Sequence, residues 1–240
     1  MMNIKKHVII LFMVTAIMLT CHNENNNVKA AVIEDGFSYS KIPASIKKRI
    51  TGSSYRKNPY ISLKELRYVR IKHYNYKGKV KSGELIVNKA IAKDVAEIFC
   101  ELYKIEYPIR RVELVDEYEA DDDLSMEADN TSCFNYRSIS GSKTLSMHGL
   151  GLAIDINPRI NPCVGGARGI VPPNGKAYKE RNVKKCTGRY KNMMIHKGDA
   201  AYKIFKEHGF EWGGEWKNMK DYQHFYKVPP KYKNCGKYEW

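Results

Sequence analysis

The sequence predicts an α+β fold, in which short antiparallel strands are followed by amphipathic helices. Apolar and polar residues alternate through residues 66–87 around two turn signals, Lys77-Gly78 and Ser82-Gly83, and this alternation predicts short antiparallel strands. Further along, apolar residues recur at helical spacing, at Ile91, Val95, Ile98, Phe99 and Leu102. Strands followed by an amphipathic helix favour a layered arrangement of helices on a sheet.

A second helix is predicted at residues 200–208, where one face carries the apolar residues Ala201, Ile204 and Phe205. Asp199 can cap its first turn, and Gly209 stands at its C-terminal stop. We expect Pro108 to end the earlier helix, because proline cannot continue one.

The length of the chain predicts one main domain. Its 240 residues, 43% of them hydrophobic, are enough for one substantial core. The segment 121–173 is rich in Gly, Ser, Asn and Pro and has little helical periodicity, so we expect it to form loops that carry a site.

The N-terminus has the pattern of a secretory signal. Lys5 and Lys6 precede an uncharged apolar run at residues 8–20, which is short for a membrane span. We therefore expect a signal peptide at 1–20, a polar linker at 21–36 and the folded domain at 37–240. Export to the cell envelope or secretion follows. Cys21 directly follows the apolar run, so a lipid anchor on Cys21 is an alternative to ordinary signal cleavage.

The net charge of +15, of which the two leader lysines contribute two, predicts attraction to polyanions. Outside a cell these are anionic wall polymers or the headgroups of a membrane surface. No nucleic-acid-binding motif is present, so we expect no nucleic acid as partner. A charge that serves solubility alone is the other interpretation.

The six cysteines include no CxxC pair, so a thiolate zinc site of the usual spacing is absent. Disulfides are allowed in an exported protein. Bridging Cys163 and Cys186 would close a loop that contributes about 3 kcal/mol in the chain-entropy model. The sequence leaves that pairing open.

One aspartate interrupts an apolar run in the stretch SMHGLGLAIDIN, residues 146–157. In a strand, Leu152, Ile154 and Ile156 would share one face, and Ala153, Asp155 and Asn157 the other. Asp155 then belongs to a polar face, and the glycine-containing link after His148 lets a turn bring its imidazole beside the carboxylate. One histidine and one carboxylate are two of the three protein ligands of a catalytic zinc site.

A third ligand is expected among the other histidines. His224 stands out because Asp221 precedes it by three residues, with aromatic neighbours on either side. Three such ligands would leave the fourth position of zinc open for water, whose proton Asp221 could take and pass to a leaving amine. Arg137 could hold the developing oxyanion.

These parts describe an amide hydrolase. In the alternative interpretation each residue is structural: His148 and Asp155 are a hydrogen-bonded pair without metal, Asp221 and His224 form a surface pair, and Arg137 is salt-bridged.

Two motifs resemble those of a known family. SMHGLGLAID matches the SxHxxGxAxD signature of LAS-type zinc peptidases, the D-alanyl-D-alanine carboxypeptidases and L-alanyl-D-glutamate endopeptidases that cut peptidoglycan peptides. DYQHF matches their second motif, an acid three residues before a histidine. The resemblance extends over about Ile50 to Lys227, through the segments GELIVNKAIAKDVAEIF, NTSCFNYR, AIDINPRINP and GFEWGGEW.

The resemblance implies a role for each motif residue. The Zn²⁺ ligands fall on His148, Asp155 and His224, and the general base falls on Asp221. Arg137 matches the arginine that binds the substrate and its oxyanion, and Ser146 matches a serine that contacts substrate. The implied fold is the hedgehog-like α+β domain, with a central antiparallel sheet flanked by helices.

The function that the resemblance implies is an exported zinc metallopeptidase that hydrolyses peptidoglycan stem peptides, most similar to a D-alanyl-D-alanine carboxypeptidase. An aspartate at Asp221 rather than a glutamate is closer to the endopeptidase branch, whereas the long loop 158–194 is closer to the carboxypeptidases. Tyr136 and Glu215 depart from the residues usual in the family, but neither is an expected ligand. A cell-wall-lytic endopeptidase and a non-catalytic zinc-containing wall-binding module are the alternatives.

Overall fold

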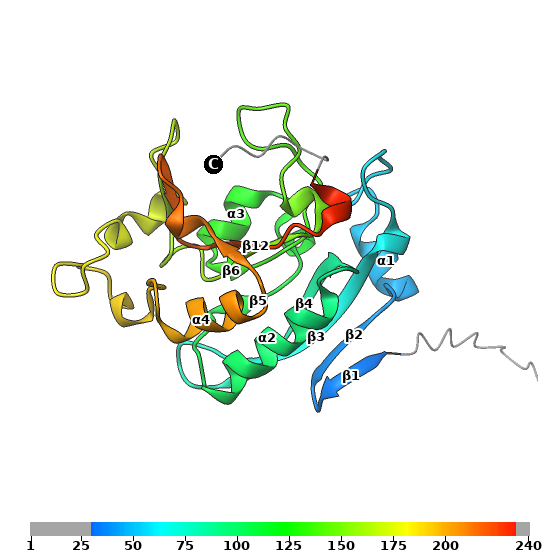
Figure 1. Ribbon diagram of the computed structural model, residues 1–240, viewed down its shortest axis with the longest axis horizontal. Coiled ribbons are helices and arrows are strands. Elements are labelled where there is room, and N and C mark those ends of the chain that lie inside the picture. The colour runs from blue at the N-terminus through cyan, green and yellow to red at the C-terminus, as the bar shows by residue number, and fades with distance from the viewer. Residues whose placement is uncertain (1–29, 234–240) are drawn as a thin grey trace, which may run out of the picture.

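The structure, a computed structural model, describes residues 30–233 of the chain (Figure 1). The predicted signal peptide at 1–20 and the lipid-anchor candidate Cys21 lie outside these residues. Within residues 30–233, no helix has the length and apolar character that a membrane span requires.

Within residues 30–233, the fold combines short strands with four α-helices and several 3-10 turns. The strands of the described part are β1 Ala31–Glu34, β2 Phe37–Ser40, β3 Leu66–Tyr74, β4 Val80–Asn88, β5 Arg111–Val112, β6 Asn130–Thr131, β7 Ala153–Asp155, β8 Cys163–Gly165, β9 Ile170–Val171, β10 Glu211–Trp212, β11 Met219–Asp221 and β12 His224–Tyr226. The α-helices are α1 Ala44–Ile50, α2 Ala92–Lys104, α3 Asp122–Glu127 and α4 Ala200–Glu207. The 3-10 segments are η1 Leu63–Glu65, η2 Val115–Tyr118, η3 His148–Leu150, η4 Pro173–Tyr178, η5 Lys191–Met193, η6 Gly213–Glu215 and η7 Pro230–Tyr232. The predicted α+β class is confirmed.

The long hairpin β3–β4 forms where alternation predicts strands, with Leu66 opposite Asn88 and Tyr74 opposite Val80. Its turn contains Gly78 in the left-handed region, at φ 68°. The second predicted turn, at Ser82-Gly83, is wrong. Gly83 lies inside β4, where an added Cβ would come within 2.6 Å of Cβ of Val112. This glycine therefore allows a close approach between chain segments and does not reverse the chain.

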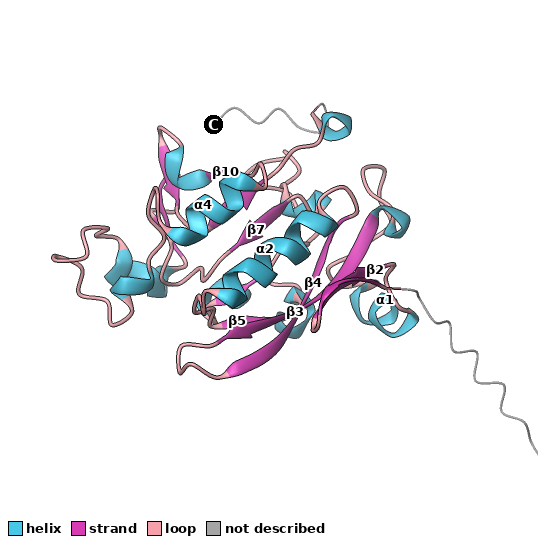
Figure 2. Cartoon of the chain, turned by 60° about the horizontal axis from the view of Figure 1, so that its bottom comes forward, coloured by secondary structure: helices cyan, strands magenta, loops and turns pink. Residues whose placement is uncertain are grey.

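The two predicted long helices are present. Helix α2 buries its apolar face against β2 and β3, and it ends at Lys104, before Pro108. In α4 the Asp199 carboxylate accepts a hydrogen bond from the Tyr202 backbone N–H at 2.8 Å, so it caps the helix as predicted. Figure 2 shows α2 between α4 and the β3–β4 hairpin, and the two helices are in contact.

The strands divide among four sheets in the described part, so the central antiparallel sheet that the resemblance implies does not include all of them. β1, β2, β3 and β4 form a four-stranded antiparallel sheet, and β7 lies at the edge of a separate sheet in the order β10-β12-β7. A third sheet has the order β11-β8-β9, and β5 pairs with β6. The strands after β4 are only two or three residues long and are interrupted by loops, which prevents one continuous ladder. One large cluster of buried apolar side chains nevertheless joins the four-stranded sheet to the β10-β12-β7 sheet.

Two segments are more regular than their composition indicates. Strand β1, at Ala31–Glu34, lies inside the stretch expected to be a linker and pairs with β2. It is an edge strand of the sheet, and its Val32 side chain is 69% exposed. The short helix α3 forms inside the stretch 121–173, where Asp121 caps it by accepting the Leu124 N–H at 3.0 Å.

The disulfide considered between Cys163 and Cys186 is not formed, since both thiols are free. Cys163 lies on β8, whereas Cys186 belongs to a small separate core with Ile160, Tyr178 and Met194. These different locations keep the two cysteines unpaired.

Candidate active site

His148 is held in one orientation by the backbone around it. It opens the 3-10 segment η3, and its Nδ1 lies 2.7 Å from the carbonyl oxygen of Cys133. A carbonyl can only accept, so Nδ1 carries a proton, and Nε2 is the nitrogen that can act as a ligand when the imidazole is neutral. The Ser146 hydroxyl accepts the His148 backbone N–H at 3.2 Å, which ties the start of the motif to the histidine.

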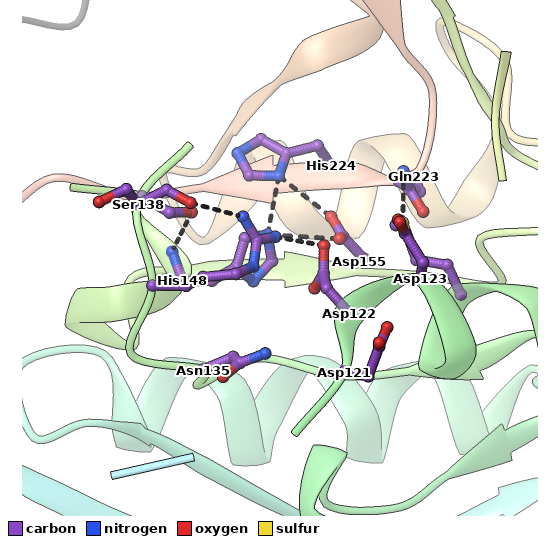
Figure 3. Close-up of polar contacts among 12 residues, drawn as sticks. Asp121, Asp122, Asp123, Asn135, Ser138, His148, Asp155, Gln223 and His224 are labelled. Atoms are coloured by element: carbon purple, nitrogen blue, oxygen red, sulfur yellow. Dashed lines mark hydrogen bonds and ion pairs between the residues drawn. The ribbon is translucent and has the colours of Figure 1, made fainter. Parts of the chain in front are cut away.

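Asp155 and His224 face each other across adjacent strands. β7 pairs with β12 in a register that places Asp155 directly opposite His224. The side-chain Oδ1 of Asp155 lies 3.0 Å from Nδ1 of His224, and its Oδ2 lies 3.3 Å from Nε2 of His148. Figure 3 shows the three side chains pointing toward one another. The two sequence motifs therefore meet at one point.

The three side chains have the chemistry and spacing of a metal site. Their ligand atoms lie within 4.8 Å of one another, and the two histidine nitrogens are 3.2 Å apart. Ligands at about 2.0–2.1 Å from a tetrahedral metal are about 3.3 Å from one another. All three residues are buried, with exposed fractions of 4–6%. Two imidazole nitrogens and one carboxylate thus fit a divalent metal ion with little rearrangement.

A second group of possible ligands, Asp94, Glu97 and His208, is already occupied by other partners. Lys227 lies 2.6 Å from the carboxylate of Asp94, Glu97 pairs with Lys93, and His208 bonds to Glu101. These contacts indicate ordinary ion pairing between α2 and the α4 end.

Burial and charge act in opposite directions on the three ligands. Burial favours a neutral Asp155, but the charges and hydrogen bonds of the two histidines outweigh it and hold the pKa of Asp155 well below its usual range. Burial also lowers the pKa of His224, and Asp155 only partly offsets this. For His148, burial is outweighed by the neighbouring Asp155 carboxylate, and its pKa is raised.

The carboxyl group of Asp221 has a raised pKa, in contrast to that of Asp155. It ends β11, and its Oδ1 is buried and has no hydrogen-bond partner among the described residues, although the residue as a whole is half-buried. Burial and the nearby charge of Asp155 raise the pKa of Asp221 to about 8. The site therefore contains one firmly ionised carboxylate and one carboxyl that holds a proton near neutral pH.

Arg137 reaches the same site from the chain segment before the first motif. One of its terminal nitrogens lies 2.6 Å from the Asp122 carboxylate, and its Nε is buried without a hydrogen-bond partner among the described residues. The Asp122 carboxylate, visible beside the ligands in Figure 3, restrains the guanidinium at the site. The arginine is thus held in place by one carboxylate while other N–H groups stay available.

One cavity of 230 Å³ unites these groups. Its walls include every residue predicted for the site: Arg137, Ser146, His148, Asp155, Asp221 and His224. Apolar side chains such as Met147, Trp216 and Met219 form much of the remaining wall. The structure brings the predicted residues together, and their roles in binding and catalysis remain predictions.

Some contributors to the site have no signal in the sequence. The ligand orientation depends on the carbonyl of Cys133, which any residue could supply. Asp122 lies in a run of three aspartates that does not distinguish it from its neighbours. Gly213 must be a glycine, because an added Cβ would lie 2.7 Å from the Asp221 carbonyl oxygen and 3.3 Å from Cβ of His224.

The remaining histidines of the described part lie outside the cavity. His73 bonds to the Ile109 carbonyl, His196 to those of Met194 and Arg181, and His208 to Glu101. Each therefore already has a structural partner.

A comparison with protein families supports the resemblance that the two motifs carry. Residues 140–227 match the model of a family described as D-alanyl-D-alanine carboxypeptidase. This part of the chain is therefore similar to that peptidase family. The matched stretch contains both motifs, whereas Arg137 lies just before it. No curated protein and no solved structure matches the chain.

The family match supports a hydrolase that acts on peptidoglycan peptides. The part of the chain before residue 140 supplies Arg137, Asp122 and the Cys133 carbonyl to the same cavity or its ligands. The site is thus assembled from the matched stretch and the segment that precedes it.

When a divalent metal ion is added to the chelator-treated and dialysed protein, we expect one ion to bind at this site. Because the ion binds only the folded state, saturation at 100 times the dissociation constant should stabilise the fold by about 2.7 kcal/mol. The replacement His224→Ala should abolish this thermal shift. The matched control His208→Ala, which changes the occupied second cluster, should keep it, and an equal loss in both variants would contradict the assignment.

The raised pKa of Asp221 predicts a pH dependence of stability in the chelator-treated protein. The folded state keeps this proton up to about pH 8, whereas an unperturbed aspartate loses it near pH 3.8. The stabilisation is therefore present at low pH and is lost as the pH rises toward 8. Between pH 5 and pH 8, the free energy of unfolding of the wild type should fall by about 2 kcal/mol more than that of Asp221→Asn. This figure allows for solvent, which screens part of the charge at the half-buried Asp221. Urea unfolding at the two pH values measures this, and parallel pH profiles would refute it.

Proposed function

We propose that this protein is an exported zinc metallopeptidase that hydrolyses amide bonds in peptidoglycan stem peptides, of the D-alanyl-D-alanine carboxypeptidase type. The observation that carries the proposal is the convergence of His148, Asp155 and His224 in a cavity that Asp221 and Arg137 also line. The family match over residues 140–227 supports the substrate class.

Zn²⁺ is the metal that suits this donor set. Two neutral imidazoles and one carboxylate are a known ligand combination for catalytic zinc, which keeps one position open. When bound, Zn²⁺ supplies Lewis-acid polarisation and lowers the pKa of a coordinated water to about 7. The protonated Nδ1 of His148, fixed by the Cys133 carbonyl, keeps its Nε2 free to act as a ligand.

Asp221 is proposed as the general base. Its unpartnered Oδ1 lies at the cavity, and a carboxyl whose pKa approaches the working pH is suited to take and return a proton. It would accept the proton of the attacking water and deliver it to the leaving amine. No other carboxyl lining the cavity combines this burial with a free oxygen, since Asp122 pairs with Arg137.

Arg137 and Ser146 are proposed to bind the substrate. The guanidinium, restrained by Asp122, would donate to the oxygen on which negative charge develops. The Ser146 hydroxyl accepts the His148 N–H, so its own proton is available for a substrate oxygen. Both groups therefore orient the peptide without large movement of the chain.

The same features bear on the alternatives. A non-catalytic wall-binding module needs neither a base nor an oxyanion-binding group, and both candidates line this cavity. An L-alanyl-D-glutamate endopeptidase would use the same machinery on a bond inside the stem peptide. The description of the matched family favours the carboxypeptidase.

We also propose the remaining features that the sequence predicts for this chain. They are the hedgehog-like version of the α+β fold, a signal peptide at 1–20, a polar linker at 21–36 before the peptidase domain at 37–240, and extracytoplasmic location with Cys21 as an alternative lipid anchor. The end of that linker stretch contains the strand at Ala31–Glu34. Mass spectrometry of the mature N-terminus would test export, and an uncleaved N-terminus in the purified protein would argue against it.

The decisive test is digestion of purified peptidoglycan. The wild type should release free D-alanine, and Asp221→Ala should keep stoichiometric zinc while turnover falls about 10²–10⁴-fold, because the proton-transfer group is lost. Product identification by mass spectrometry separates the branches, since a new N-terminus inside the stem peptide would indicate the endopeptidase.

Lys220→Ala is the matched control, because it changes the neighbouring residue of β11, which does not line the cavity. Its turnover should stay close to that of the wild type. Retained turnover in Asp221→Ala would remove this residue from the mechanism, and absence of any product with zinc bound would favour the wall-binding module.

A further inference from the structure

A second cavity, of 300 Å³, lies apart from the candidate active site and shares no lining residue with it. Its walls are formed by residues from five separate stretches of the chain, and much of the wall comes from the long loop 173–197, which is the yellow region at the left of Figure 1. Three arginines, Arg110, Arg159 and Arg189, and three tyrosines, Tyr76, Tyr178 and Tyr190, line it.

The loop is anchored by its own small core and by a half-buried arginine. The core contains Ile160, Tyr178, Cys186 and Met194. The Arg181 guanidinium donates to the carbonyl oxygens of Ile160 and Ile195, each at 2.8 Å. Its centre also lies 4.3 Å from the centroid of the Tyr222 ring. The cavity wall is therefore preformed and does not require a ligand to order it.

Two of the three arginines of the cavity lie over aromatic rings, and none of the three forms an ion pair within residues 30–233. Arg110 lies 5.8 Å from the centroid of Tyr76, and Arg189 lies 5.5 Å from that of Tyr190. The two rings pack together at 4.6 Å. Within residues 30–233, the arginine ion pairs involve Arg49, Arg111, Arg137 and Arg168 and none of these three arginines. Their N–H donors remain available.

The one acid in the cavity wall is Asp129, and its two oxygens are used to build the wall. One accepts the backbone N–H of Arg159 at 3.0 Å, and the other accepts the Tyr76 hydroxyl at 2.9 Å. Its exposed fraction is 3%. One buried carboxylate thus faces three guanidinium groups, and the cavity keeps an excess of positive charge.

The surroundings of the cavity extend this charge. The loop 173–197 contains eight lysines and arginines and a single acidic residue, Glu180. An extended basic surface around a basic cavity suits a ligand with repeated negative charges. The positive electrostatic potential of the loop attracts the parts of such a ligand that lie outside the cavity.

We propose that this cavity binds a phosphate group of a phosphodiester polymer, such as a polyol phosphate. A guanidinium fork matches the two oxygens of one planar carboxylate, whereas three guanidiniums from separate chain segments suit the tetrahedral oxygens of a phosphate. The tyrosine rings provide an apolar wall for the polyol carbons between phosphates.

A soluble or wall-attached polymer fits better than a lipid surface, although both present phosphodiesters. Membrane-surface sites combine basic residues with exposed apolar side chains that enter the bilayer. The exposed large apolar residues of the described part are Val32, Tyr60, Val80, Ile105 and Leu124, and none lies in the loop 173–197 or lines this cavity.

The test is binding of the purified protein to short poly(glycerol phosphate) at constant salt, measured by calorimetry. Each of Arg110→Gln, Arg159→Gln and Arg189→Gln should weaken binding about tenfold, because each removes charge-assisted hydrogen bonds. The control Lys184→Gln, Lys185→Gln, Lys203→Gln removes three positive charges from positions outside the cavity wall, more than any single arginine variant removes. This triple variant should stay within about threefold of the wild type, because these lysines do not line the cavity and salt screens their charge at a distance.

Several outcomes would overturn the proposal: no binding of poly(glycerol phosphate), an equal loss in the lysine control, equal affinity for polyglutamate, or tighter binding to phosphatidylglycerol vesicles than to the polymer. The arginine variants should hydrolyse a soluble stem peptide like the wild type, because they lie outside the candidate active site. Polymer binding is therefore tested independently of peptidase activity.

Discussion

Antiparallel pairing between β7 and β12 places Asp155 opposite His224, and the candidate active site depends on this register. A shift by one residue would turn the Asp155 side chain to the other face of the strand and separate the ligands. The third ligand, His148, comes from a 3-10 turn whose direction is set by the Cys133 carbonyl. Backbone pairing and one backbone hydrogen bond therefore bring together motifs that are far apart in the sequence.

Two buried carboxyl groups in this cavity respond to their surroundings in opposite ways. Asp155 has an imidazole on each side and stays ionised, whereas burial of the Asp221 carboxyl and the nearby Asp155 charge raise the pKa of Asp221. A site that lowers the pKa of one carboxyl group and raises that of the other provides both a permanently anionic ligand and a group that exchanges protons near neutral pH. The proposed division between metal ligand and general base follows from that difference.

Arginines are used in three different ways around the two cavities. Arg137 is restrained by Asp122 at the candidate active site, and the half-buried Arg181 ties down the long loop. In the second cavity, Arg110 and Arg189 lie over tyrosine rings and keep their donors free. The basic composition of the chain is thus not spread uniformly, because only some of its positive groups are paired within the fold.

The sequence by itself determined the two long helices, the hairpin and the six residues that gather in the first cavity, because periodicity, capping residues and motif spacing are local properties. Only the tertiary structure decided that the strands divide among four sheets in the described part, that Gly83 packs against Val112, and that Asp122 restrains Arg137. These features arise from contacts between distant segments. The orientation of His148 depends on a backbone carbonyl, an atom that every residue carries, so no residue pattern could reveal it.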